Sequence, residues 1–195
     1  MNMNYEQEVS KFGKKDAAIA IGLFAYWLIL IFVINIIKLI YDISDEAWRI
    51  PDIVIAVVNI IIVLALVKLR KQSLASIGLH KKNIFPAIGV GLMFAPVMLV
   101  LRGLLPGLTN GWTLHSIGTI LLGSASVALM AVREDITFVG FIQTRLHGLV
   151  KNDFWAVNSG AAIFMILHMP HQLVLGVPMG WINFVQWLLF TFLMH

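Results

Sequence analysis

The chain has 195 residues, of which 59% are hydrophobic and only 12% are charged. A soluble domain is about 45–50% apolar and about 25% charged, so the composition predicts an integral membrane protein. The net charge of +4 gives no indication of nucleic acid binding. The absence of cysteine excludes disulfides, thiolate metal sites and thiol nucleophiles.

In chain order, residues 1–16 are predicted to form a cytoplasmic tail and residues 17–195 a helical membrane domain. The uncharged stretch 17–37 is longer than the apolar core of a cleaved signal peptide, about 7–15 residues, so we interpret it as a retained first helix. Further apolar spans follow at 53–67, 84–101, 117–150, 154–169 and 177–195. At about 20 residues per crossing, the fold predicted is an all-α bundle of about six transmembrane helices.

The distribution of Lys and Arg predicts how this bundle is oriented. Ten of these residues lie in the tail, in the segment 68–83, or at Arg145 and Lys151, whereas the alternate loops hold three. Cytoplasmic loops of membrane proteins carry an excess of Lys and Arg. The amino terminus is therefore predicted to be cytoplasmic, and Arg145 is predicted to lie at the cytoplasmic interface.

Three adjacent charges, Arg133, Glu134 and Asp135, interrupt the longest apolar tract. One interpretation ends a helix at Val132 and places the charges in a cytoplasmic loop. The other continues the helix from about 124 to 147, and the absence of Gly and Pro between 124 and 139 favours it. The charges then lie within the apolar layer, where ionisable residues mark a functional site.

The spacing around the next turn brings a second ionisable residue to the same height. Glu134 lies about 17 residues before the turn near Lys151, and His168 lies about 16 residues after it. At ~1.5 Å per residue, both side chains are about 25 Å from the turn, on adjacent helices. We therefore predict that Glu134 and His168 share a polar cavity, open to the cytoplasm.

The segment 134–146, EDITFVGFIQTRL, resembles the first motif of the CAAX-processing and bacteriocin-processing (CPBP, abortive-infection-like) intramembrane proteases, E-E-x-x-F-R-G. Glu134, Phe138 and Gly140 match this motif, and Asp135 is a shortened version of its second Glu. The matching residues fall in the helix that carries the three charges.

The segment 164–172, FMILHMPHQ, resembles the second motif of the same family, F-x-x-x-H, which Phe164 and His168 meet. The resemblance spans roughly residues 73–172. It implies a protease-like core at about 115–195, in the plasma membrane of a bacterium. The implied partners are the lipid bilayer and a peptide or membrane-protein substrate, with no nucleic acid.

Two departures from the family pattern stand beside the matches. Val139 stands where the motif has Arg. In the family pattern that Arg comes four residues after the second acid and lies on the same helical face, so Asp135 loses its expected partner. The third motif, H-x-x-x-N, is expected some tens of residues past the second. The sequence stops at His195 inside an apolar stretch, so we expect a core that is incomplete at the carboxyl end.

The resemblance implies hydrolysis of a peptide bond within the membrane. Glu134 would act as general base on a water, and His168 would stabilise the oxyanion or hold a metal; Asp135 and Phe164 would support them. Whether a zinc ion takes part stays open. Glu134 and His168 are the two ligands available, whereas a catalytic zinc takes about three protein ligands.

Other interpretations of the same residues stay open. Glu134 and Asp135 fit a helix-end charge pair, His168 fits a structural His bonded to a backbone carbonyl near Pro170, and we interpret His171 as a loop-end residue. We interpret Asn35 as a polar contact between helices.

The second functional hypothesis is a catalytically inactive family member that acts as a bacteriocin-immunity or interaction membrane protein. Val139 and the missing third motif favour it. A small transporter has least support, because we find no paired inverted repeat.

Overall fold

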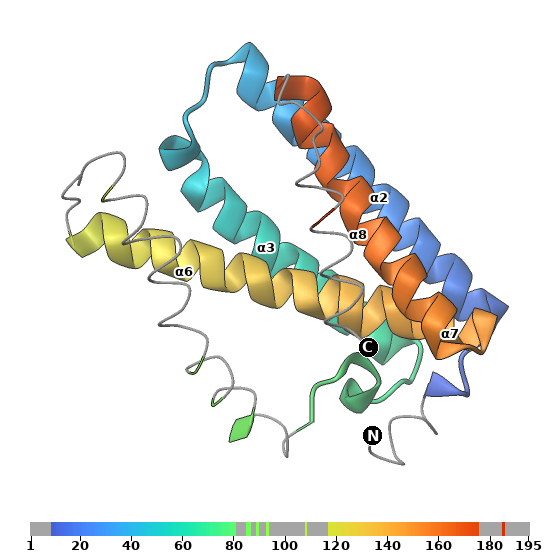
Figure 1. Cartoon of the computed structure of the whole chain (residues 1–195). Helices are drawn as coiled ribbons and strands as arrows, with labels where there is room; N and C mark the ends of the chain where they lie inside the picture. The colour runs from blue at the N-terminus through green and yellow to red at the C-terminus, as the bar shows by residue number, and fades with distance from the viewer. Residues whose placement is uncertain are drawn as a thin grey trace.

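The computed structural model describes residues 9–80 and 117–175, with a few isolated positions outside these ranges. The described residues form four helices and no strand (Figure 1). These are α2 (Lys14–Ile40), α3 (Asp45–Leu69), a continuous helix over 117–150, and α8 (Asp153–Leu175). The all-α prediction is confirmed for these residues. The predicted spans 84–101 and 177–195 lie outside the described residues, so six spans stay a prediction.

The continuous helix over 117–150 has three parts with different hydrogen bonding. It begins as α6 (Ile117–Glu134), continues as a π-helical segment (Asp135–Gln143), and ends as α7 (Thr144–Val150). The three adjacent charges therefore lie inside a helix, as the lack of Gly and Pro predicted. A π-helical stretch is rare and is frequently found at functional sites. Here it begins directly after Glu134.

Helices α2 and α3 are long and apolar enough to cross a membrane. In each, only 22% of the most apolar 18-residue window is buried, so most of these side chains are half-buried or exposed. Ile29 and Ile61, for example, are 64% and 58% exposed. Ser44 starts α3, because its hydroxyl accepts a hydrogen bond from the Ala47 amide at 3.2 Å and caps the helix.

The helices pack in two pairs that share one core. Helix α2 lies alongside α8, and α3 packs against α6 (Figure 1). Aromatic rings fill the region where the pairs meet: the Phe138 ring lies 6.3 Å from Trp27 and 5.6 Å from Phe164, centroid to centroid. Such tilted and edge-on contacts between rings stabilise a core beyond the area that they bury.

Arg145 is buried within the protein; its predicted place at the cytoplasmic interface stays a prediction. Its guanidinium is fully buried between the rings of Phe12 and Phe141, 4.4 and 4.1 Å from their centroids. It donates to the carbonyl and hydroxyl oxygens of Ser76 at 3.0 and 2.9 Å, and to Oε1 of Gln72 at 2.6 Å. Oxygen acceptors and aromatic faces thus solvate a cation that the sequence analysis expected to find near the end of this helix.

Gly140 lets the π-helical segment approach the 3₁₀ turn Leu74–Ile77. A Cβ at this position would lie 2.6 Å from the carbonyl oxygen of Ile77. Because a real Cβ does not come this close to a backbone atom, the contact requires glycine. The turn therefore contacts the helix 117–150 at two places. Ile77 packs against Gly140, and Ser76 accepts hydrogen bonds from Arg145.

Candidate functional site

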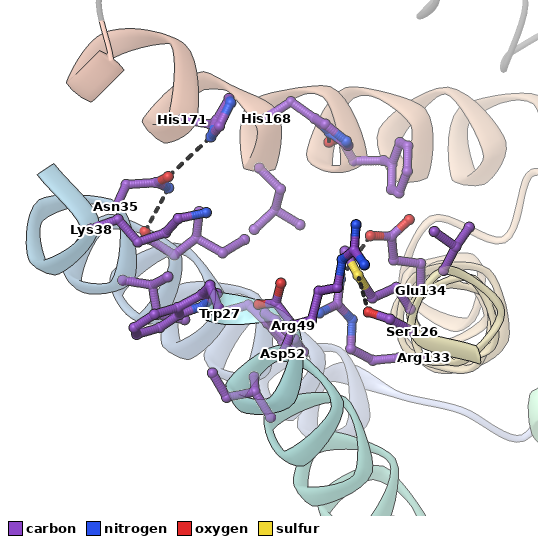
Figure 2. Close-up of a pocket in the computed structure, with 18 of the residues that line it drawn as sticks. Trp27, Asn35, Lys38, Arg49, Asp52, Ser126, Arg133, Glu134, His168 and His171 are labelled. Carbon is purple, nitrogen blue, oxygen red and sulfur yellow. Dashed lines mark hydrogen bonds and ion pairs between the residues drawn. The ribbon is translucent and has the colours of Figure 1, made fainter. Parts of the chain in front are cut away.

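A cavity of about 680 Å³ lies between α2, α3, α6 and α8 (Figure 2). Its walls are mainly apolar, as in most ligand pockets, with a small set of polar side chains. The apolar walls include Trp27, Ile31, Ile55, Met130, Phe138 and Leu167. Glu134 and His168 both line this cavity, so the structure brings together the two residues that the spacing predicted at one height.

Glu134 is paired with its neighbour in the chain. Nη2 of Arg133 donates to Oε1 of Glu134 at 2.7 Å, and the Arg133 guanidinium lies 4.6 Å from the centre of the Trp27 ring. Arg133 is only 9% exposed. A charge-assisted hydrogen bond and an aromatic face therefore hold the cation beside the carboxylate, within an apolar surrounding. The sequence analysis missed this pair, because adjacent residues on a helix do not normally face each other.

His168 is held by the preceding turn of its own helix. Its Nδ1 lies 2.9 Å from the carbonyl oxygen of Phe164, and the two rings lie 4.8 Å apart. A carbonyl only accepts, so Nδ1 carries a proton and donates it in this bond, whereas Nε2 takes no part in the bond. This is the backbone-bonded His that the alternative interpretation described. The bond also fixes the ring and leaves Nε2 as the reactive nitrogen.

His171 lies on helix α8 rather than at the end of a loop, so that interpretation was wrong. Helix α8 continues through Pro170 to Leu175. His171 donates from Nδ1 to Oδ1 of Asn35 on α2 at 3.0 Å, which confirms that Asn35 joins two helices (Figure 2). Both residues line the cavity. Pro170 lacks the amide hydrogen for one backbone hydrogen bond of the helix. Helix α8 nevertheless continues past it, and it packs closely on α2.

The other two residues implied by the resemblance differ in their placement. Phe164 lines the cavity, and its ring contacts both Phe138 and His168. Asp135 is exposed and is not among the residues that line the cavity. The carboxylate that enters the cavity is thus that of Glu134 alone in this stretch of the chain.

The cavity extends to the ends of α2 and α3 that meet at the connection 41–44. Lys38, Arg49 and Asp52 line it there, and sequence analysis had assigned them no role (Figure 2). The Arg49 guanidinium packs against Gly123, 3.6 Å from where a Cβ would be, which is ordinary van der Waals contact. This end is opposite to the amino-terminal end of α2. The described part of the cavity thus lies toward the end opposite to the predicted cytoplasmic side, and its opening to the cytoplasm stays a prediction.

The donor set does not fit a catalytic metal ion within the described part of the chain. No group of three or more His, Asp or Glu side chains that could hold a metal occurs there. Glu134 is already bonded to Arg133, which leaves His168 and His171 as the nitrogen ligands on the cavity. A catalytic zinc takes about three protein ligands. No metal-dependent step follows from this geometry.

The residues that carry the family resemblance lie on α6, the π-helical segment and α8. A scan against protein-family models, a search of curated proteins and a search of solved structures gave no match for the chain. We therefore infer a function from the geometry of the cavity, which Glu134 and His168 both line.

Proposed function

We propose that the protein is an intramembrane endopeptidase of the CPBP type, with Glu134 as general base and His168 in the active site. The observation that carries this proposal is that the two side chains, which are 34 positions apart in the sequence, line one mostly apolar cavity. An apolar site that excludes bulk water strengthens the electrostatic interactions on which peptide hydrolysis depends.

We propose the following roles for the side chains. Glu134 accepts a proton from the attacking water, whose oxygen bonds to the scissile carbonyl carbon; the proton then passes to the leaving nitrogen as the C–N bond breaks. His168 orients the water through Nε2, because its Nδ1 is committed to the Phe164 carbonyl. Arg133, which donates to Glu134, would offset the negative charge that develops as the water attacks. Asp135 has no part in this proposal, since it does not line the cavity.

The proposed orientation has a cytoplasmic amino terminus in a bacterial plasma membrane. Three basic segments support it, because they meet at one end of the described helices. Phe12 at this end packs against Gly148, next to the turn at Lys151, and Asp16 binds Arg70 after α3. With this orientation, the cavity belongs to the outer half of the membrane. A peptide segment would enter it from the bilayer.

The test is cleavage by the purified protein in liposomes. We would fuse these with vesicles of the host membrane, label the new amino termini chemically, and identify them by mass spectrometry. Glu134→Gln should reduce the rate at least 100-fold, because a general base contributes about 10²–10⁴-fold. Asp135→Asn is the matched control: it makes the same chemical change on the next residue, outside the cavity, and should cleave normally. Unchanged cleavage by Glu134→Gln would rule out the assigned base.

A catalytically inactive membrane binder is the second candidate. The observation that favours it is the short bond between Arg133 and Glu134, which occupies the carboxylate, together with Val139 in place of the motif Arg. In that case no new amino termini appear with the wild-type protein. The biological effect would then persist in Glu134→Gln, whereas a protease would lose it.

A further inference from the structure

Trp27 of helix α2 lies against the charged pair of the cavity. Its side chain is 1% exposed and lines the cavity (Figure 2), and the guanidinium of Arg133 lies over its ring, 4.6 Å from the centroid. The same guanidinium donates to Oε1 of Glu134 at 2.7 Å. Trp27 is therefore joined to the proposed base through a single side chain, that of Arg133.

The helix that carries Arg133 and Glu134 does not by itself hold the two side chains together. Adjacent residues of a helix point in different directions, so their side chains do not normally meet. The pair therefore needs a contact from outside its own helix. Among aromatic rings, Trp attracts a cation most strongly, and the attraction is greatest where water is excluded. Arg133 is only 9% exposed, so the contact with Trp27 meets this condition.

Arg133 also has fewer oxygen acceptors than the other buried arginine. Its Nε is buried and has no hydrogen-bond partner within the described part of the chain. Arg145, in contrast, donates to several oxygen atoms in addition to its contacts with two rings. A buried cation is costly unless other groups replace its water. For Arg133 the ring of Trp27 and the carboxylate of Glu134 do so together.

The indole nitrogen of Trp27 supplies a second reason to assign the ring a role. Nε1 is buried and makes no hydrogen bond among the described residues. A buried donor without an acceptor destabilises a protein, and Phe would fill much of the same space without such a donor. What Trp adds over Phe is a ring that attracts a cation more strongly. The contact with Arg133 is where this property is used.

The Trp27 ring is itself held by the aromatic core. Phe138 lies 6.3 Å from it at an interplanar angle of 58°. Phe138 also packs edge-on against Phe164, whose ring lies 4.8 Å from that of His168. The contacts that hold Glu134 and those that support His168 therefore meet at Trp27 and Phe138.

We propose that Trp27 is a positioning residue, which fixes Arg133 and thereby holds the carboxylate of Glu134 in place for the attacking water. This role rests on the proposed function, because it concerns the geometry of the same base. A displacement of about 1 Å at a catalytic site can cost about 100-fold in rate. Loss of the contact from α2 should therefore slow cleavage although the base itself is still present.

The test is cleavage of host-membrane vesicles, followed by the rate at which labelled amino termini appear. Trp27→Phe keeps an aromatic ring but weakens the attraction for Arg133, so it should lower the rate about three-fold. Trp27→Leu removes the ring and should lower the rate about 30-fold. Trp155→Leu is the matched control and should cleave normally, because Trp155 is 59% exposed on α8 and does not line the cavity.

A second set of variants asks whether Trp27 acts through Arg133. In Arg133→Met, which lacks the cation, Trp27→Leu should lower the rate by no more than about two-fold, because residues that act as a unit have non-additive effects. Equal reductions in both backgrounds would overturn the proposal, since they would show a general loss of packing. If Trp27→Leu does not fold, Trp27→Phe is compared in the two backgrounds with the same criterion.

Failure of the positioning role and failure of the proposed function give different results. Normal cleavage by both Trp27 variants, together with loss of cleavage in Glu134→Gln, would overturn the positioning role and leave the proposed base. An equal reduction by Trp155→Leu and Trp27→Leu would overturn it as well. Absence of cleavage by the wild type, or normal cleavage by Glu134→Gln, would overturn the proposed function and with it the role of Trp27.

Discussion

Gly140→Ala tests the contact that joins the π-helical segment to the 3₁₀ turn. The added methyl group would lie 2.6 Å from the carbonyl oxygen of Ile77 and 3.3 Å from that of Asp135. Both atoms belong to the backbone, so no side-chain rotation relieves the contact. Overpacking of a close-packed interior costs about 1–3 kcal/mol, and we expect Gly140→Ala at the upper end of that range. Separating the turn from the helix also lengthens the bonds between Arg145 and Ser76.

Gly22→Ala is the matched control for this experiment. Gly22 lies in α2, and nothing lies within 4 Å of where its Cβ would be. Alanine should therefore leave stability unchanged or raise it by up to about 1 kcal/mol through its higher helix propensity. The assay is reversible unfolding in mixed micelles with increasing SDS, followed by far-ultraviolet circular dichroism. Equal stability of Gly140→Ala and Gly22→Ala would refute the close approach to Ile77.

The remaining predictions concern three polar contacts, each measured by the same unfolding assay. Arg145→Met should cost roughly 3–5 kcal/mol, because it leaves several buried oxygen acceptors without their donor; a loss below about 1 kcal/mol would contradict this network. Asn35→Leu should cost about 0.6 kcal/mol, the mean for a hydrogen bond between membrane helices, because it removes the bond from His171. Ser44→Ala should cost about 1 kcal/mol by removing the cap of α3, and Ser44→Asp should retain it.

The length of the apolar tracts and the positions of Gly and Pro predicted where most of the described helices lie. The tract 17–37 lies within α2, and the tract 117–150 coincides with the continuous helix. The start of α3 was placed eight residues too late, at 53 instead of Asp45. The charged residues before 53 resemble a loop, although Ser44 followed by acidic residues is a start signal for a helix. The sequence contained this signal, but the prediction of the helix start relied on hydropathy alone.

The local details of the site depend on contacts between segments that are far apart in the sequence. The spacing of apolar residues does not predict such contacts. The π-helical register follows the close approach of Gly140 to Ile77 and the bonds of Arg145, all of them to residues about 70 positions away. The buried place of Arg145 likewise requires the rings of Phe12 and Phe141 on either side. That Glu134 and His168 line one cavity was predictable, because the prediction needed only two antiparallel helices of similar length on either side of a turn.

The change to π-helical geometry also alters what the missing motif Arg means. An Arg at position 139 would face Asp135 only if the helix were α-helical there, since partners on one face of an α-helix are four positions apart. In the π-helix the hydrogen bonds run from i to i+5, and it is Gly140 whose Cβ position lies 3.3 Å from the carbonyl of Asp135. The α-helical pairing of residues four positions apart, on which the expected partner of Asp135 depended, therefore does not hold in this segment. In this chain the carboxylate with an arginine partner is that of Glu134, which accepts a hydrogen bond from Arg133. The Arg133 guanidinium also lies over the ring of Trp27, so the pair contacts α2.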